Sequence, residues 1–225
     1  MSEPRTSFEK AKQNTVRQVA KRGHYDVETV NRVLDSTLLG NVAFTTPAGP
    51  TIVPMLFARR DDLLLFHGST KSRLMEMLCS GKTVCLSATL LDGLVLAKSV
   101  FHHSMNYRSV TVFGSGHEIV DEQERFEALR IITDKVMVGR WEDARQPNQQ
   151  EMKATCVAAV KIESASVKIR EGDPVEDSDD LKLPVWSGVI PLRQVASEPV
   201  PVASDAESAV PEYLRSWMRQ TEKNQ

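Results

Sequence analysis

The chain has 225 residues, of which 41% are hydrophobic and 26% are charged, and its formal net charge is −2 at pH 7. This length suits one large domain or two small ones, and the slightly acidic balance argues against a nucleic-acid-binding protein. The longest apolar stretch is broken by Asp92 and Gly93, no apolar signal segment follows Met1, and we therefore expect a cytoplasmic protein that does not enter membranes.

Residues 1–23 are rich in lysine and arginine and lack a sustained apolar face. We expect them to form a basic arm that is loose or packs on a neighbour. The first helix is predicted over residues 25–37, where Asp26 can cap the N-terminus and valines recur at helical spacing.

The periodicity then changes to that of β-strands joined by short turns. Strand patterns and helical patterns follow one another over residues 41–46 (strand), 51–60 (strand), 63–68 (strand), 69–81 (helix), 82–91 (strand), 109–121 (strand), 121–137 (helix), 148–171 (a short helix, then strands) and, after an acidic loop, 183–192 (strand). Hairpin turns favour antiparallel pairing, and we find no alternation of strands and helices typical of a parallel sheet. The pattern predicts a mainly β fold, an antiparallel sheet closed into a small barrel with flanking helices.

The predicted organisation has three parts. The basic arm (1–23) precedes one folded domain (24–193), and a flexible C-terminal tail (194–225) follows it. Within the tail, Tyr213, Leu214, Trp217 and Met218 have the spacing of a short amphipathic helix.

The sequence HGSTKSR joins the third strand to the second helix. Free backbone N–H groups at a helix start and the forked guanidinium of an arginine both suit a phosphate. The candidate phosphate ligands are Ser69, Lys71, Ser72 and Arg73. A serine-capped, solvated first turn would explain the same residues. Gly68 would allow a ligand to approach the backbone, whereas His67 is more typical of a structural hydrogen-bonding residue.

Other polar and aromatic residues lie at the ends of strands. His102 and His103 are adjacent, so they face opposite sides of a strand, and we expect no metal site there. Tyr107 and Arg108 could flank an aromatic or anionic ligand, or face a partner subunit. Trp186 offers either a stacking surface or a core side chain.

The cysteines Cys79, Cys85 and Cys156 have no metal-ligand spacing. We expect free thiols, with Cys85 and Cys156 as small core residues because they lie in apolar strand patterns.

Seven stretches, in this order, carry a family resemblance: RGHYD, TIVPMLFA, LFHGSTKSRLM, TLLDGLVLAKSVFHHSMNYRSVTVFG, GRW, KATCVAAVKI and LPVWSGVIPL. Over residues 22–193 the chain resembles the flavin-nucleotide-binding proteins of the pyridoxamine 5′-phosphate oxidase-like superfamily, including the nitroimidazole-reductase type. The resemblance implies an FMN-binding split β-barrel and a homodimer with FMN at the subunit interface.

The resemblance also implies roles for particular residues. The phosphate of FMN would lie on the segment that contains His67, Gly68, Ser69, Lys71, Ser72 and Arg73. The strand with Val53, Pro54 and Met55 would run along the flavin ring. A proline is tolerated in this strand because the side facing the ligand needs no backbone hydrogen bond to a neighbouring strand. Tyr107, Arg108 and Trp186 would lie near the pocket shared by the two subunits. The oxidase branch often has a lysine where this chain has Leu74, so one cation is missing.

The implied function is an FMN-dependent oxidoreductase that passes electrons from a reduced nicotinamide to a small acceptor such as a nitro compound or quinone. No catalytic acid or base can be assigned. The oxidase's C-terminal arginine-and-histidine motif is absent, so we do not expect vitamin B6 oxidation. The alternative is a non-catalytic FMN- or haem-binding or sensing protein, with His67 or His102 as a haem ligand.

Overall fold

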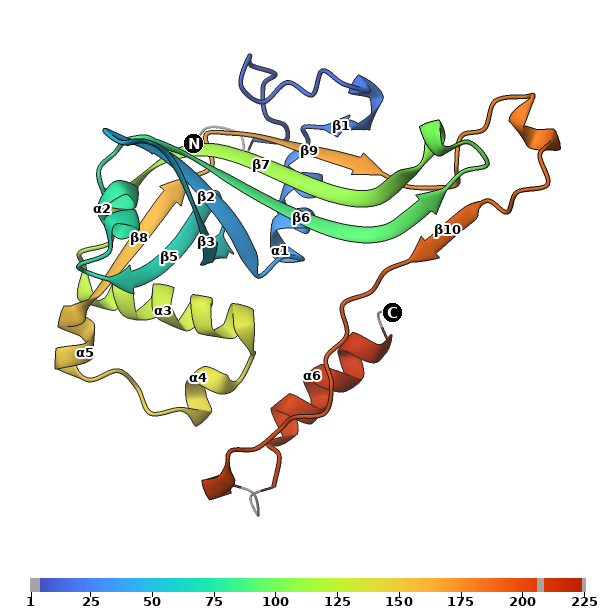
Figure 1. Cartoon of the computed structure of the whole chain (residues 1–225). Helices are drawn as coiled ribbons and strands as arrows, with labels where there is room; N and C mark the ends of the chain where they lie inside the picture. The colour runs from blue at the N-terminus through green and yellow to red at the C-terminus, as the bar shows by residue number, and fades with distance from the viewer. Residues whose placement is uncertain (1–4, 206–208, 224–225) are drawn as a thin grey trace.

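The structure, a computed structural model, describes residues 5–205 and 209–223 (Figure 1). The strands of this part are β1 (Gly23–His24), β2 (Leu39–Thr46), β3 (Gly49–Leu56), β4 (Ala58–Arg60), β5 (Leu63–Ser69), β6 (Thr83–Leu96), β7 (Ser104–Glu118), β8 (Thr155–Lys161), β9 (Ser164–Arg170) and β10 (Gly188–Pro191). Its α-helices are α1 (Val27–Asp35), α2 (Arg73–Cys79), α3 (Glu122–Val136), α4 (Arg140–Asp143), α5 (Gln149–Ala154) and α6 (Glu212–Lys223). The predicted mainly β, antiparallel fold with flanking helices is confirmed.

The sheet curls around its interior but does not close. Its hydrogen-bonded path is β3-β2-β6-β7-β8-β5-β4, so β3 and β4 are the two edges of the path. These strands follow each other in the chain and are joined end to end through the fully buried Phe57, so they do not pair side by side. The closed barrel expected from the strand pattern is therefore wrong, and the open curl agrees with a split barrel.

Two apolar clusters fill the two faces of this curl. The inner cluster contains Val30, Val33 and Leu34 of α1, all fully buried, together with inward side chains of the sheet. The second cluster lies under α3 and contains Leu65, Leu129, Ile132 and Val157. The Asp26 side chain caps α1 by accepting a hydrogen bond from the Thr29 N–H at 2.8 Å, as the sequence predicts. Hydrogen bonding by the Thr29 side chain is the main cause that lowers the pKa of Asp26, and the bond from the Thr29 N–H lowers it further.

Strands β6 and β7 are longer than the sequence suggests and extend beyond the barrel (Figure 1). The register between them shifts between Leu91 and Gly93, so Asp92 is an extra residue in a β-bulge. The Asp-Gly pair reads as a turn in the sequence, but here the strand bends and continues to Leu96.

The basic arm packs on its own chain. Phe8 belongs to the inner cluster, and β1 pairs with β9. Asn14 is buried, and its amide donates to the carbonyl of Ala165 in β9 at 3.2 Å.

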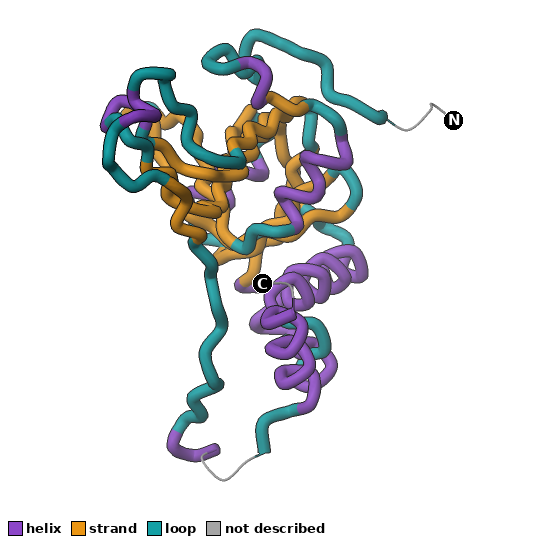
Figure 2. Tube along the Cα trace, turned by 90° about the vertical axis from the view of Figure 1, so that its right-hand side faces the viewer, coloured by secondary structure: helices purple, strands orange, loops and turns teal. Residues whose placement is uncertain are grey.

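The C-terminal segment leaves the sheet after β10 and returns as α6 beside the other helices (Figure 2). The Tyr213 hydroxyl donates to Asp143 Oδ2 at 2.8 Å and accepts from Arg140 Nη1 at 3.0 Å, which joins α6 to α4. None of the helices described is both long and apolar enough to cross a membrane.

Candidate functional site

The junction of β5 and α2 is shaped by two serine hydroxyls. Ser69 Oγ accepts a hydrogen bond from the Lys71 N–H at 3.2 Å, and Ser72 Oγ caps α2 by accepting from the Met75 N–H at 3.4 Å. A capping hydroxyl can still donate its own hydrogen. The side chains of Lys71 and Arg73, which flank Ser72, are both exposed.

These two cations have no anionic partner among the side chains that the structure describes. By contrast, Arg59 pairs with Asp35 at 2.6 Å and Arg145 pairs with Glu151 at 2.7 Å. Two unpaired cations two residues apart, next to two hydroxyls, form a donor set that matches an anion such as a phosphate.

Gly68 and Met55 meet on the inner side of this junction, although their strands are not paired with each other. A Cβ atom at Gly68 would lie 2.9 Å from Met75 Cγ and 3.6 Å from Met55 Cε. The glycine thus makes room for Met75 of α2. Met55 and Val53 pack against the inner cluster, whereas Pro54, the next residue of an alternating strand, is exposed on the other side. The three residues expected along a flavin ring therefore divide between two faces.

The side of the sheet that carries Pro54 is here termed the outer face. Cross-strand partners share a face, so the register carries this face from β3 through β2, β6 and β7 to β9. Tyr107 lies on it. Large apolar side chains are exposed on the same face: Ile52 (67%), Leu91 (44%), Leu94 (36%), Met105 (49%) and Ile190 (44%). A protein normally buries such a set against another surface.

A cavity of about 380 Å³ lies between the basic arm and the outer face. Tyr107, Ser109 and Thr111 of β7 and Ser166 and Lys168 of β9 form its floor, and residues 13–18 form its wall. Its lining is polar and includes the cations of Arg17 and Lys168. Of the expected site residues, only Tyr107 lines it.

Arg108 lies on the opposite side of β7 and is already paired. Its Nε donates to Asp92 Oδ2 at 3.0 Å and its Nη2 to Asp92 Oδ1 at 2.7 Å. Hydrogen bonding to Asp92 raises the pKa of Arg108. The guanidinium of Arg108 is thus paired within the chain. The expectation that it flanks an aromatic or anionic ligand, or faces a partner subunit, stays a prediction. Trp186, in the loop before β10, is 65% exposed and its ring covers Gly188.

Three of the five histidines bear on the candidate site, and each lies in a different environment. His67 is opposite Val157, on the side covered by α3, and its Nδ1 is buried with no hydrogen-bond partner in the described part of the chain. Burial lowers the pKa of His67. His102 Nε2 lies 3.1 Å from Asp177 Oδ2. His103 is exposed, and its Nδ1 lies 3.0 Å from the Ser99 carbonyl oxygen.

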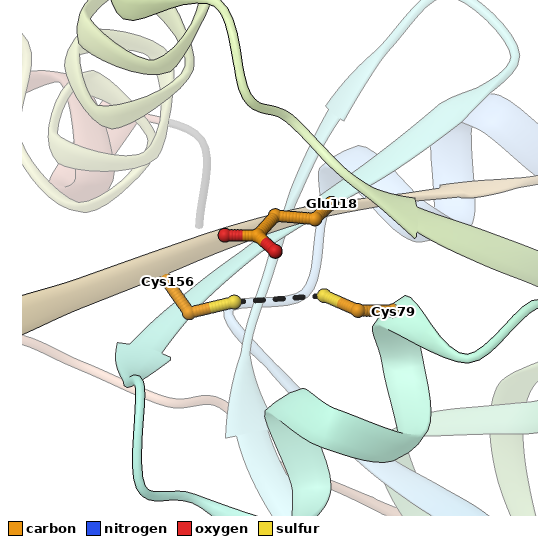
Figure 3. A group of neighbouring side chains, drawn as sticks. All are labelled: Cys79, Glu118 and Cys156. Carbon is orange, nitrogen blue, oxygen red and sulfur yellow. Dashed lines mark hydrogen bonds between the residues drawn. The ribbon is translucent and has the colours of Figure 1, made fainter.

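The structure also brings together two cysteines that are far apart in the sequence. Cys79 Sγ and Cys156 Sγ are 3.5 Å apart, and the Glu118 carboxylate lies beside them (Figure 3). Desolvation, followed by the hydrogen bond with Cys156, raises the pKa of Cys79 to about 12. These thiols are therefore poor nucleophiles at neutral pH. Their 77-residue separation gives no sequence signal of the contact.

Comparisons with known proteins converge on one superfamily. The family model for pyridoxamine 5′-phosphate oxidase matches residues 26–169. No curated protein sequence matches the chain.

Solved structures indicate the same superfamily, and the similarity covers more of the chain than the family model does. A flavocytochrome from Azotobacter vinelandii is 35% identical with a TM-score of 0.86, over 92% of this chain and 96% of that one. A FAD- and haem-binding protein from Mycobacterium smegmatis is 32% identical with a TM-score of 0.82, over 87% of this chain and 96% of that one. A protein named for 5-nitroimidazole antibiotic resistance, from Bacteroides thetaiotaomicron, shares the fold at 24% identity and a TM-score of 0.54, over 64% and 84% of the two chains.

Proposed function

The chain belongs to the pyridoxamine 5′-phosphate oxidase-like superfamily, and from this premise we propose that it is a flavin-binding oxidoreductase. The observation that carries the proposal is its likeness, over nearly the whole length of each chain, to a flavocytochrome and to a FAD- and haem-binding protein. The family resemblance found in the sequence is confirmed.

Lys71 and Arg73 are the proposed ligands of the flavin phosphate, assisted by the hydroxyls of Ser69 and Ser72. Two observations support this role. Both cations are exposed without an ion-pair partner in the described residues, and both serine hydroxyls are held at the turn by backbone N–H groups. Charged hydrogen bonds to phosphate are stronger than neutral ones, and the forked guanidinium of Arg73 can donate two of them in parallel, so Arg73 should contribute more to the affinity than Lys71.

The flavin is either FMN or FAD. The sequence resemblance predicts FMN, whereas the relative from Mycobacterium smegmatis is a FAD-binding protein. Both molecules carry the phosphate next to the ribityl chain, so the same cations would serve either of them. Competitive titration with the two nucleotides distinguishes them.

A homodimer is the proposed assembly, with the outer face as its interface. The exposed apolar side chains of Ile52, Leu91, Leu94 and Met105 support this choice, because a second copy would remove them from water. Pro54 and Tyr107 lie on the same face, so the ring of a flavin bound there would be shared between subunits.

A bound flavin would supply the hydride and electron transfer, and this chain's residues would bind it and shield it from solvent. A reduced nicotinamide as donor and a nitro compound or quinone as acceptor are the proposed substrates.

Haem binding is a second candidate, favoured by both relatives, since one is a flavocytochrome and the other binds haem as well as FAD. Of the two histidines expected as ligands, His102 has its Nε2 beside Asp177, and His67 lies under α3. His103 is better suited, because its Nδ1 lies against a backbone carbonyl and its Nε2 is left for a metal. The exposed Val100 and Phe101 next to it would contact an apolar ring.

The absorption spectrum of the purified protein, recorded before and after addition of FMN, FAD or haem, tests both candidates. Flavin bands that bleach on anaerobic addition of reduced nicotinamide would support the oxidoreductase. Flavin bands that persist would support binding without turnover, and a protein that binds no flavin would refute the proposal.

A further inference from the structure

A group of metal-ligating side chains lies at the C-terminal end of α2, away from the candidate phosphate ligands. Cys79 ends α2, Glu118 ends β7, and Cys156 lies near the start of β8. One ligand atom from each, two sulfurs and a carboxylate oxygen, lies within 4.8 Å of the other two. Figure 3 shows the Glu118 carboxylate directed toward the gap between the sulfurs.

The distance between the two sulfurs suits a shared metal ion better than a covalent bond. Two thiolates bound to one tetrahedral zinc at ~2.3 Å are separated by about 3.8 Å. A disulfide requires about 2.05 Å. The observed separation of 3.5 Å is close to the first value and far from the second.

We propose that Cys79, Cys156 and Glu118 bind one divalent metal ion of the zinc class. Thiolate ligands select zinc and similar borderline or soft ions over magnesium and calcium. Three protein ligands leave a fourth tetrahedral position for water, and the exposure of Glu118 provides an entry path from solvent. The proposal does not depend on flavin binding.

A neighbouring cation balances the net charge that the site would carry with a metal ion bound. Two thiolates and a carboxylate carry three negative charges, which one divalent ion does not neutralise. The guanidinium of Arg125 donates from Nη2 to the carbonyl oxygen of Thr155 at 2.6 Å, next to Cys156 in the chain. Its positive charge offsets the remaining negative charge.

A metal ion in this place would connect three elements, α2, β7 and β8. The helix α2 also carries, at its other end, Arg73, which has no ion-pair partner among the described side chains. Metal binding should therefore stabilise the fold and fix the helix that bears this cation. Since an ion that binds only the folded state raises its stability, the thermal midpoint should rise with metal concentration.

Cobalt(II) is the probe for the test, because its thiolate complexes absorb visibly and in the near ultraviolet. The full-length chain, free of affinity tags and fully reduced, is titrated anaerobically. We expect thiolate-to-cobalt bands that saturate at one ion per chain and disappear when zinc is added. The Cys79→Ser and Cys156→Ser variants should lose the bands, while Glu118→Gln should bind at least ~10-fold more weakly.

Cys85→Ser is the matched control, since Cys85 is a half-buried thiol outside the group, and it should keep both bands and stoichiometry. Glu118 is exposed, so Glu118→Gln tests the site without disturbing the core. Absence of thiolate bands in the reduced wild-type protein would overturn the proposal. Bands that survive in Cys79→Ser, or a Cys79–Cys156 disulfide in a protein that binds no cobalt after reduction, would overturn it as well.

Discussion

Arg108 and Asp92 form a two-pronged ion pair across the bulge between β6 and β7, with N···O distances of 3.0 and 2.7 Å. The carboxylate belongs to the extra residue of the bulge, and the arginine lies opposite Leu90 on the neighbouring strand. The pair thus holds the irregular segment where both strands leave the barrel. It also offsets the charge of Arg108 within the chain, through two of the five N–H donors of the guanidinium.

Replacing Asp92 with Ala should lower the free energy of unfolding by about 1 kcal/mol and leave flavin affinity unchanged. The pair is bidentate but about one third exposed on each side, so solvent screening reduces its contribution. Urea unfolding of the two single variants and the Asp92→Ala/Arg108→Ala double variant measures the coupling. A coupling near zero would show that the pair does not stabilise the bulge.

Replacing Arg73 with Ala should weaken flavin binding by ~1.5–3 kcal/mol, which is the scale of a hydrogen bond to a charged group. Fluorescence titration with FMN and with FAD gives the affinity. Arg145→Ala is the matched control, because Arg145 is an exposed arginine already paired with Glu151. Wild-type affinity in Arg73→Ala would exclude this residue from the phosphate site.

Features of the fold that depend on residues close together in the chain could be predicted from the sequence, whereas contacts between distant residues could not. Local patterns were sufficient for α1 with its Asp26 cap and for most strands, because capping and alternation involve near neighbours. The bulge at Asp92 was missed because Asp-Gly reads equally well as a turn, and only pairing with β7 decides between them. The Cys79–Cys156 contact was missed because it depends on how α2 packs on β8.

His67 should make stability depend on pH. Burial lowers its pKa from the ordinary value of 6.5, so the unfolded chain binds a proton that the folded protein excludes. The contribution of His67 to the free energy of unfolding is then constant above pH 6.5. It is lost as the pH falls from 6.5 toward the lower pKa that His67 has in the folded protein. Urea unfolding at several pH values from 7.5 to ~5 should show a shallower decline for His67→Gln than for wild type. Parallel curves would mean that His67 titrates normally in the folded protein.

Lysine at Ile52 or Met105 should dissociate the proposed homodimer. Each substitution places a charge on the outer face, where burial against a second copy would leave it unpaired. Sedimentation equilibrium should show the mass of a dimer for wild type and of a monomer for the variants. Val200→Lys is the control, since Val200 is 92% exposed in the tail and off the sheet. A wild-type monomer that binds flavin fully would contradict the shared site.

His103→Ala should abolish the Soret band of haem-reconstituted protein if this histidine is the axial ligand. The Ser99 carbonyl beside His103 Nδ1 favours the tautomer that presents an unprotonated Nε2 to the iron, whereas the Nε2 of His102 lies against Asp177. His102→Ala is therefore the control and should retain the band. Flavin titration of both variants separates the two cofactors, because neither histidine lies among the proposed phosphate ligands. Loss of the band in His102→Ala alone would transfer the ligand role to that residue, and a band unchanged in both variants would move the haem away from this segment.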